Sequence, residues 1–179
     1  RGVITLFYDV VGRGTELLCG MKRGSTLNVI GPLGTGFDPS FGGASGMALL
    51  IAGGIGIAPL LFLAERLLKN NDRRITLMMG ARSASQLSMI DGLLPGGVVL
   101  MTATDDGSMG YHGFVTDLAK ESLPGIKPAV LYTCGPYPMM LRIAGLAVEN
   151  DIPCQVSLEE RMACGIGACL VCVCKIKAE

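Results

Sequence analysis

The sequence lacks tryptophan, contains one histidine and carries no excess of charge of either sign. Fifteen lysines and arginines balance fifteen aspartates and glutamates, and there is no basic run. Because nucleic-acid binding depends on a positive surface that neutralises phosphates, this balance argues against a nucleic-acid partner. Only 17% of the 179 residues are charged while 50% are hydrophobic, which excludes a disordered chain and predicts a buried core.

A membrane-spanning segment and a targeting segment are not expected either. Residues 47–64 contain no charge and reach the length of a membrane helix. Three glycines and Pro59 interrupt them, so a strand at 48–51, a glycine turn and a helix at 59–69 describe them better. The chain begins at Arg1, next to a strand-like stretch, so we expect a cytoplasmic fragment without a leader or a membrane partner.

Glycine and cysteine are the residue types present in excess. The 26 glycines are about twice the usual share of roughly 7%, and they form clusters without a three-residue period. This pattern excludes collagen and favours glycine-rich ligand loops. The seven cysteines are an odd number, and four of them lie within residues 164–174. A reduced metal site is therefore favoured over a disulfide framework.

Two hydrophobic patterns divide the chain. Residues 3–11 and 26–30 predict strands of an all-β unit around a short helical patch at 15–18, and two such strands need partners. After a linker at 31–46, rich in glycine and proline, apolar strands alternate with helices. This predicts an α/β domain with a parallel sheet covered on both faces. Its expected strands are 48–51, 75–79, 98–102, 130–133 and 154–157, and its expected helices are 59–69, 84–91, 113–121 and 137–149.

The first candidate ligand loop joins an expected strand to an expected helix and reads Gly53-Gly54-Ile55-Gly56-Ile57-Ala58-Pro59. Glycines let the backbone approach a pyrophosphate closely, and a helix start offers free N–H groups with a partial positive charge. Pro59 stands where the usual dinucleotide fingerprint has its third glycine. A glycine-rich turn selected for packing therefore remains an alternative.

Loops after other strands should lie at the same edge of the sheet. Thr133-Cys134-Gly135-Pro136, followed by Met139, is one of them. The Cys134 thiol would either pack against a nicotinamide ring or fill space. Arg82-Ser83 and residues 104–107 are polar loops, so they are either ligand contacts or solvated turns. Arg82 is a candidate for a ribose phosphate, and the choice between NAD and NADP stays open.

The most specific motif is C-x4-C-x2-C, formed by Cys164, Cys169 and Cys172. This is the ligand spacing of plant-type [2Fe–2S] sites, in which thiolates bind the irons. Zinc sites usually take two C-x2-C pairs and only one is present, so zinc or unliganded cysteines are weaker alternatives. Cys174 follows too closely to be favoured as the fourth ligand, which we expect beyond Glu179.

The remaining thiols are not expected to bind the metal, and the single histidine receives no role. Cys19, Cys134 and Cys154 are scattered along the sequence and are expected in the apolar core rather than at a metal. His112 stands in a Tyr-His-Gly turn and is expected at the surface.

These motifs, in this order, resemble those of the ferredoxin reductase-like family, and most closely its electron-transfer subunits that serve two-subunit dihydroorotate dehydrogenases. The most specific stretch is SLEERMACGIGACLVCVCK, residues 157–175. Supporting stretches are VVGRGTELL (10–18), GPLGTGF (31–37), AGGIGIAPL (52–60), GARS (80–83), TDDGSMGYHGFVTDL (104–118) and YTCGP (132–136).

The resemblance implies three cofactor regions and no catalytic side chain. It makes residues 1–40 the C-terminal part of an FAD-binding β-barrel, 41–157 a Rossmann-like domain for a nicotinamide dinucleotide, and 158–179 an incomplete [2Fe–2S] segment. It assigns Gly12, Gly14 and Thr15 to the FAD pyrophosphate, Gly53, Gly54 and Gly56 to the dinucleotide, Cys134 and Gly135 to the nicotinamide, and Cys164, Cys169 and Cys172 to the cluster. Pro59 and Arg82 remain candidates for the dinucleotide from their places in the loops.

The implied function is that of an oxidoreductase subunit. It would pass electrons between NAD(H), FAD and the cluster, to or from an FMN-containing dihydroorotate dehydrogenase catalytic subunit in pyrimidine biosynthesis. A reductase for a hydrogenase, ferredoxin or oxygenase would use the same cofactors, and a zinc-braced protein-binding module is the alternative of another class. The family's arginine-containing flavin motif and its downstream fourth cysteine are both absent, as expected for a chain truncated at both ends.

Overall fold

The computed structural model describes residues 2–43, 45–70, 73–158, 160 and 162–174. The chain divides into two compact units, one of residues 1–36 with 159–179 and the other of residues 37–158. All the buried side chains that the structure describes lie between Ala48 and Ala147. The 37–158 unit therefore contains the hydrophobic core.

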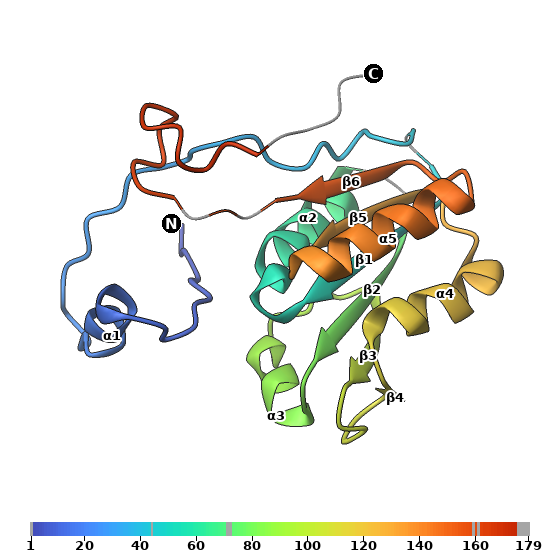
Figure 1. The fold of residues 1–179 in the computed structure, drawn as a ribbon, viewed down its shortest axis with the longest axis horizontal. Coiled ribbons are helices and arrows are strands. Elements are labelled where there is room, and N and C mark those ends of the chain that lie inside the picture. Colours follow the sequence, from blue (N-terminus) through green and yellow to red (C-terminus); the bar gives the residue numbers. More distant parts are fainter. Residues whose placement is uncertain (1, 44, 71–72, 159, 161, 175–179) are drawn as a thin grey trace. The chain divides into compact units, whose positions relative to one another are not determined.

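Six strands build the sheet of the 37–158 unit, and they are labelled in Figure 1. They are β1 (Met47–Gly53), β2 (Arg74–Ala81), β3 (Val98–Thr104), β4 (Tyr111–His112), β5 (Val130–Cys134) and β6 (Cys154–Ser157). Their order in space is β4-β3-β2-β1-β5-β6, and all neighbours are parallel. The chain runs outward from β1 to β4 and then returns to β5 on the other side of β1. This reversal makes the carboxyl ends of β1 and β5 the point at which such sheets bind ligands.

Helices pack on both faces of this sheet. Figure 1 shows α4 (Val115–Ile126) and α5 (Tyr137–Glu149) in front of the strands and α2 (Ile57–Asn70) behind them. The α4 and α5 helices also contact each other, and an exposed ion pair of 3.1 Å joins Arg142 to Asp117 between them. Three short elements lie in the connections: η1 (Gly54–Gly56), α3 (Ala84–Leu87) and η2 (Ser88–Ile90).

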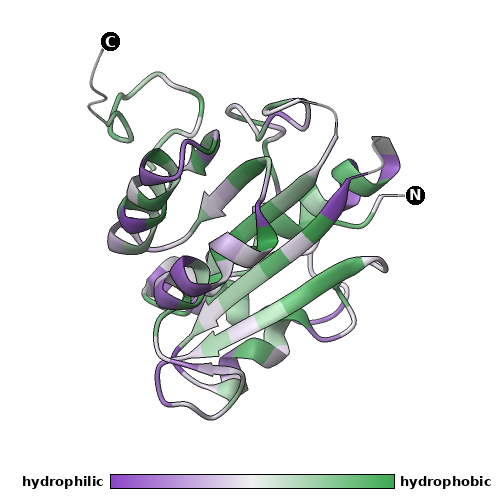
Figure 2. Cartoon of the chain, turned by 90° about the vertical axis from the view of Figure 1, so that its right-hand side faces the viewer, coloured by the Kyte–Doolittle hydropathy of each residue, from purple (hydrophilic) through white to green (hydrophobic). Residues whose placement is uncertain are grey.

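The central strands are apolar because they are covered on both faces. Six of the seven β1 residues and all five β5 residues are buried. Alternate strand residues, among them Leu49, Ile51 and Leu131, pack into one core with α4 and α5. Figure 2 shows the resulting pattern, with hydrophobic colour along the strands and hydrophilic colour on the outer sides of the helices.

The structure confirms the predicted parallel α/β class. Each of the five expected strands lies within an observed one, and 154–157 matches β6 residue for residue. The sequence missed β4, which at two residues is too short to show a periodicity. The helix expected at 59–69 begins at Ile57, and the one expected at 84–91 is divided into α3 and η2. The helix expected at 113–121 is observed as α4, which begins two residues later and continues to Ile126.

The uncharged stretch 47–64 divides into β1, η1 and the start of α2, as expected. Across the part of the chain that the structure describes, no helix combines the length and the apolar character needed to cross a bilayer.

The described residues of the unit formed by 1–36 and 159–179 have little regular structure. Its described residues form one helix, α1 (Arg13–Cys19), which confirms the helical patch expected at 15–18. The strands expected at 3–11 and 26–30 are not observed, because neither segment pairs with another strand among the described residues. Apolar alternation favours an extended chain, but a strand also needs a hydrogen-bonded partner. The FAD-binding role of 1–40 stays a prediction.

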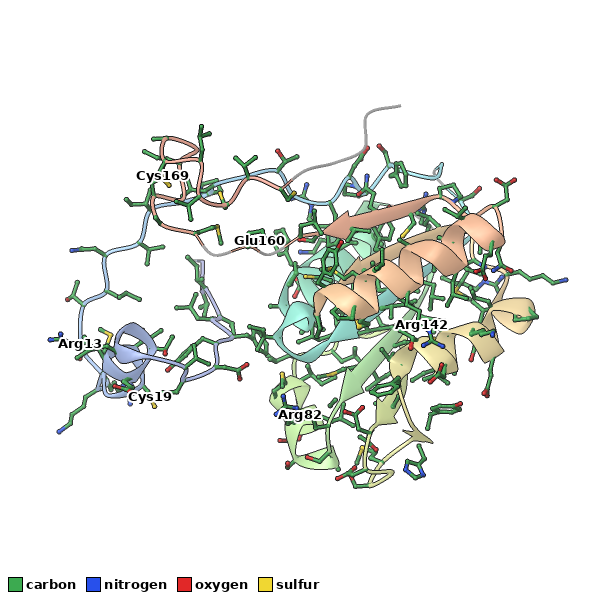
Figure 3. The ribbon with its side chains drawn as sticks, viewed as in Figure 1. Arg13, Cys19, Arg82, Arg142, Glu160 and Cys169 are labelled. Atoms are coloured by element: carbon green, nitrogen blue, oxygen red, sulfur yellow. The ribbon has the colours of Figure 1, made fainter. Side chains whose placement is uncertain are left out.

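Cys19 also differs from expectation. It was predicted to lie in the apolar core, but it is exposed at the end of α1, a helix without buried residues. Figure 3 labels Cys19 and Arg13 at the two ends of this helix. The error arises because a cysteine's burial depends on what packs against its helix, which a single residue does not reveal.

Candidate functional site

The loops after β1 and β5 meet with almost no space between their backbones. A Cβ atom at Gly56 would lie 2.5 Å from the carbonyl carbon of Cys134 and 2.7 Å from the amide nitrogen of Gly135. A Cβ atom at Gly135 would lie 2.8 Å from the amide nitrogen of Gly53. Since real Cβ contacts essentially never fall below 3.0 Å, only glycine fits at Gly56 and Gly135. Gly135 also has a φ of +150°, which side chains disfavour.

Two helices begin at this meeting point. α2 follows directly after η1, and α5 follows directly after Pro136. The first N–H groups of a helix have no partner within it, and the amino-terminal end carries a partial positive charge. Pro59 is the third residue of α2, where its missing N–H costs the helix no hydrogen bond. Close backbone approach together with two helix starts suits the phosphates of a dinucleotide.

Cys134 is fully buried as the last residue of β5. The neighbouring hydroxyl of Thr133 donates a hydrogen bond of 3.0 Å to the carbonyl oxygen of Ile51, which ties β5 to β1 beneath the two loops. The structure thus places Cys134 at the predicted edge of the sheet. Packing against a nicotinamide and filling space both agree with this position.

The loops after β2 and β3 are joined by hydrogen bonds. The amide of Ala84 donates to the Ser108 hydroxyl at 2.7 Å, and the amide of Asp106 donates to the carbonyl of Arg82 at 3.2 Å. Ser108 in turn donates to the Asp106 carboxylate through its amide and its hydroxyl, and these bonds lower the pKa of Asp106. The exposed Arg82 side chain lies beside α3 in Figure 3. Residues 82–84 and 105–108 thus form a polar platform, which adjoins the glycine loops along the same edge of the sheet.

The cysteine motif lies on an irregular loop that carries the Cys169 label in Figure 3. The Cys169 amide donates a hydrogen bond of 3.4 Å to the Cys164 sulfur. Hydrogen bonds from the backbone and then the side chain of Cys169, with weaker ones from Ile166 and Ala168, lower the pKa of the Cys164 thiol to about 6. Positive φ values at Gly165 and Gly167 turn the loop around this sulfur.

The described residues, taken as they stand, do not bring three cysteine, histidine or carboxylate side chains within reach of one metal ion. The loop nevertheless contains the thiol groups that a cluster needs as ligands, and backbone N–H groups point at the Cys164 sulfur. Assignment of Cys164, Cys169 and Cys172 as ligands stays a prediction.

Gly12, Gly14 and Thr15 lie together at the start of α1. The Thr15 hydroxyl oxygen accepts hydrogen bonds from the amides of Val11 and Gly12, at 3.0 and 3.2 Å, and its proton is donated to the carbonyl of Gly12 at 2.9 Å. These bonds explain the turn locally. They leave the predicted role of the three residues at a flavin as a prediction.

Sequence reasoning singled out most of the residues at this edge but missed two contacts. Ser108 was not assigned, although its hydroxyl joins two loops 24 residues apart. Met139 was noted beside the Cys134 motif without a role, and the structure packs its side chain against Gly53 and Gly135. Its position in the first turn of α5 was the available signal, since that turn faces the ligand edge.

Comparison with protein families identifies two segments. Residues 50–144 match the oxidoreductase NAD-binding domain, and residues 159–179 match the iron–sulfur cluster binding domain of dihydroorotate dehydrogenase B. The first match covers the two glycine loops and the Arg82 loop. The second covers all four clustered cysteines.

Curated relatives are similar over nearly the whole chain. An electron transfer subunit of dihydroorotate dehydrogenase B (NAD(+)) from Desulforamulus reducens is 43% identical over 98% of this chain and 66% of its own length. The corresponding subunit from Caldanaerobacter subterraneus subsp. tengcongensis is 38% identical over 98% of this chain and 67% of its own length. The chain thus spans about two thirds of the length of these relatives.

Solved structures agree on the fold. One described as an NADH-dependent reduced ferredoxin-NADP oxidoreductase, studied for flavin-based electron bifurcation, superposes with a TM-score of 0.78 at 35% identity. It covers 92% of this chain and 58% of the other chain. A ferredoxin reductase of a carbazole 1,9a-dioxygenase has a TM-score of 0.57 at 22% identity, over 67% of this chain and 39% of that one, and supports the fold alone.

Proposed function

We propose, because the chain belongs to the family of electron transfer subunits of dihydroorotate dehydrogenase B, that it passes electrons between NAD(H), a flavin and an iron–sulfur cluster. The observation that carries the proposal is the meeting of the β1 and β5 loops at Gly56 and Gly135. At this point only backbone atoms fit between the two loops, and two helices begin beside them. Free amides at closely approaching glycine loops and helix starts are the groups that bind a dinucleotide pyrophosphate.

The roles of the chain's own residues follow from their positions. The amides around Gly53, Gly54 and Gly56 would hold the pyrophosphate, and Cys134 with Gly135 would border the nicotinamide. Arg82, on the adjoining platform, would lie toward the adenosine end. The nicotinamide, when bound, would accept a hydride as NAD+ or donate one as NADH, and no side chain acts as a nucleophile or an acid–base pair in this proposal.

Cys164, Cys169 and Cys172 would hold a [2Fe–2S] cluster. Their thiolates suit iron, and the Cys169 amide already donates toward the Cys164 sulfur, as hydrogen bonds to sulfur do in such sites. Gly12, Gly14 and Thr15 would lie at the FAD pyrophosphate. A bound cluster supplies single-electron transfer.

The partner would be an FMN-containing catalytic subunit that oxidises dihydroorotate to orotate, joined with this chain in a hetero-oligomer in the cytoplasm. The names of the curated relatives as electron transfer subunits support such a partner. A second candidate is a ferredoxin, since the structure at 35% identity is named a ferredoxin-NADP oxidoreductase.

The test combines a cofactor assay with a partner assay. Anaerobically purified protein that carries the natural ends of its gene, and with them the fourth ligand expected beyond Glu179, should contain two irons and two labile sulfides per cluster site, as a [2Fe–2S] centre has by definition. C169S should lose both, whereas C174S, which changes another exposed cysteine of the same segment, should retain them. Equal loss in both variants would instead assign Cys174 as a ligand, and stoichiometric zinc would contradict the cluster.

For the partner, the holoprotein is added to a dihydroorotate dehydrogenase catalytic subunit, and NADH formation from dihydroorotate is followed. NAD-linked activity that depends on this chain supports the proposal. Activity with reduced ferredoxin and none with dihydroorotate would favour the second candidate.

A further inference from the structure

We infer that Met139 is a positioning residue of the dinucleotide site: its thioether packs on the loops after β1 and β5 and sets the gap between them. The inference rests on the proposed function, since it concerns the same site. It assigns a role to a side chain that neither donates nor accepts a hydrogen bond to a dinucleotide.

The contacts of Met139 join both loops. A Cβ atom at Gly53 would lie 2.7 Å from the Met139 sulfur and 2.7 Å from the Pro136 Cδ atom, so the thioether and the proline ring both pack on the Gly53 backbone. A Cβ atom at Gly135 would lie 2.9 Å from the Met139 Cε methyl group. The last two heavy atoms of one side chain thus touch a glycine on each loop.

Met139 also connects this contact to the core. It is half-buried in the first turn of α5 and packs against the core cluster that α4 and α5 share with the sheet. Because protein cores are close-packed and yield little, the side chain transmits the position of α5 to the two loops. The glycine amides that would face the pyrophosphate therefore depend for their positions on Met139 as well as on the contact between the two loop backbones.

Methionine suits this place for a chemical reason. An unbranched thioether fills an irregular gap, and it offers no polar group to compete for the free amides at the helix starts. Leucine has a similar volume and apolar character, and such exchanges are tolerated best. Valine lacks the atoms that reach the two glycines, and alanine leaves a void.

The adjacent methionine provides a matched control. Met140 is 4% exposed and lies in the same helix, but it supplies none of the three atoms nearest to the Cβ position of Gly53, Gly56 or Gly135. Truncation of Met140 should lower stability by the loss of core packing. It should leave the separation of the loops unchanged.

The experiment measures the Kd of NADH by equilibrium dialysis for the full chain and four variants, with the Tm of each. M139A and M139V should weaken NADH binding by about tenfold, the effect of losing about one hydrogen bond from a displaced amide to a charged phosphate. M139L should stay within about twofold, since leucine restores the packing. M140A should lower Tm while its Kd stays within about twofold.

The possible outcomes distinguish a failure of this inference from a failure of the proposed function. If wild-type protein binds NADH but M139V and M139A bind it within twofold of wild type, the inference is wrong while the proposed function stands. If M140A weakens binding as much as M139A at equal loss of Tm, Met139 acts only through stability and the inference is also wrong. If wild-type protein does not bind NADH, both the proposed function and the inference fail.

Discussion

Gly56 and Gly145 show that replacing glycine by a residue with a side chain has different effects at two positions of the same 37–158 unit. At Gly56 the space for a Cβ atom is already taken by the backbone of Cys134 and Gly135. At Gly145, an exposed residue within α5, nothing lies within 4 Å of that position. Burial and neighbours, rather than residue type, decide what each glycine contributes.

We predict that G56A lowers the free energy of unfolding by about 1–3 kcal/mol, as overpacking of a close contact does. It should also abolish NADH binding, since the two loops must separate. G145A should raise stability by about 0.5–1 kcal/mol, because alanine favours a helix over glycine. Urea denaturation and dialysis with NADH measure both effects, and an unchanged Kd for G56A would contradict the proposed pyrophosphate site.

We predict that the Cys154 thiol makes the free energy of unfolding fall at alkaline pH. Burial raises the pKa of its thiol to about 11, whereas in the unfolded chain it ionises near 9. Between these values the folded state binds the proton more tightly, so this contribution to stability is complete below about pH 9 and is lost as pH rises toward 11. Unfolding free energies across this range should decline less steeply in C154A than in wild-type protein. Parallel curves for the two proteins would contradict the burial of this thiol.

At the scale of elements, the segment 37–43 is held onto the sheet by β5 and β6. The Tyr132 hydroxyl lies 3.0 Å from the Asp38 carbonyl oxygen and 3.3 Å from that of Phe41, and Phe37 packs edge-on against the Tyr132 ring at 5.5 Å. The Asp38 amide donates to the Gln155 side chain at 3.0 Å. The end of the glycine-rich linker thus belongs to the 37–158 unit.

We predict that Y132F lowers the free energy of unfolding by about 1 kcal/mol, the usual net value of one hydrogen bond. This corresponds to a fall in Tm of about 2–4 °C for a protein of this size. The matched control is Y111F, which removes a hydrogen bond of 2.7 Å to the exposed Glu121 and should change Tm less. Thermal unfolding by circular dichroism compares them, and an unchanged Tm for Y132F would mean that the linker contact does not stabilise the protein.

At the scale of the whole molecule, the two units differ in how they are stabilised. Among the described residues of 2–36, 160 and 162–174 none is buried, whereas the sheet and its helices contain the entire described core. Burial of apolar surface is the main driving force of folding. The 37–158 unit should therefore fold by itself, without the flanking segments.

We predict that a fragment of residues 37–158 unfolds cooperatively and binds NADH within about twofold of the full chain, since pre-organised sites keep their shape. It should contain no iron, because the cysteine motif lies outside it. Circular dichroism, dialysis and metal analysis test these three statements. A fragment without a thermal transition would show that the flanking segments contribute to the core.

The sequence alone determined the features that depend on neighbours along the chain. Strand and helix alternation predicted the parallel α/β class because each element's apolar period is local, and the spacing of Cys164, Cys169 and Cys172 indicated a metal site for the same reason. The glycine loop at 53–56 was recognisable because its place between a strand and a helix is also local. These signals were sufficient to identify the family resemblance.

Only the tertiary structure decided what depends on residues far apart. It placed Gly56 against Gly135 and Met139 against Gly53, contacts between positions about 80 residues apart that no local pattern encodes. It left Cys19 exposed and residues 3–11 without a paired strand, because burial and pairing require a partner surface. Local periodicity specifies which elements can form, whereas packing between them specifies which side chains meet.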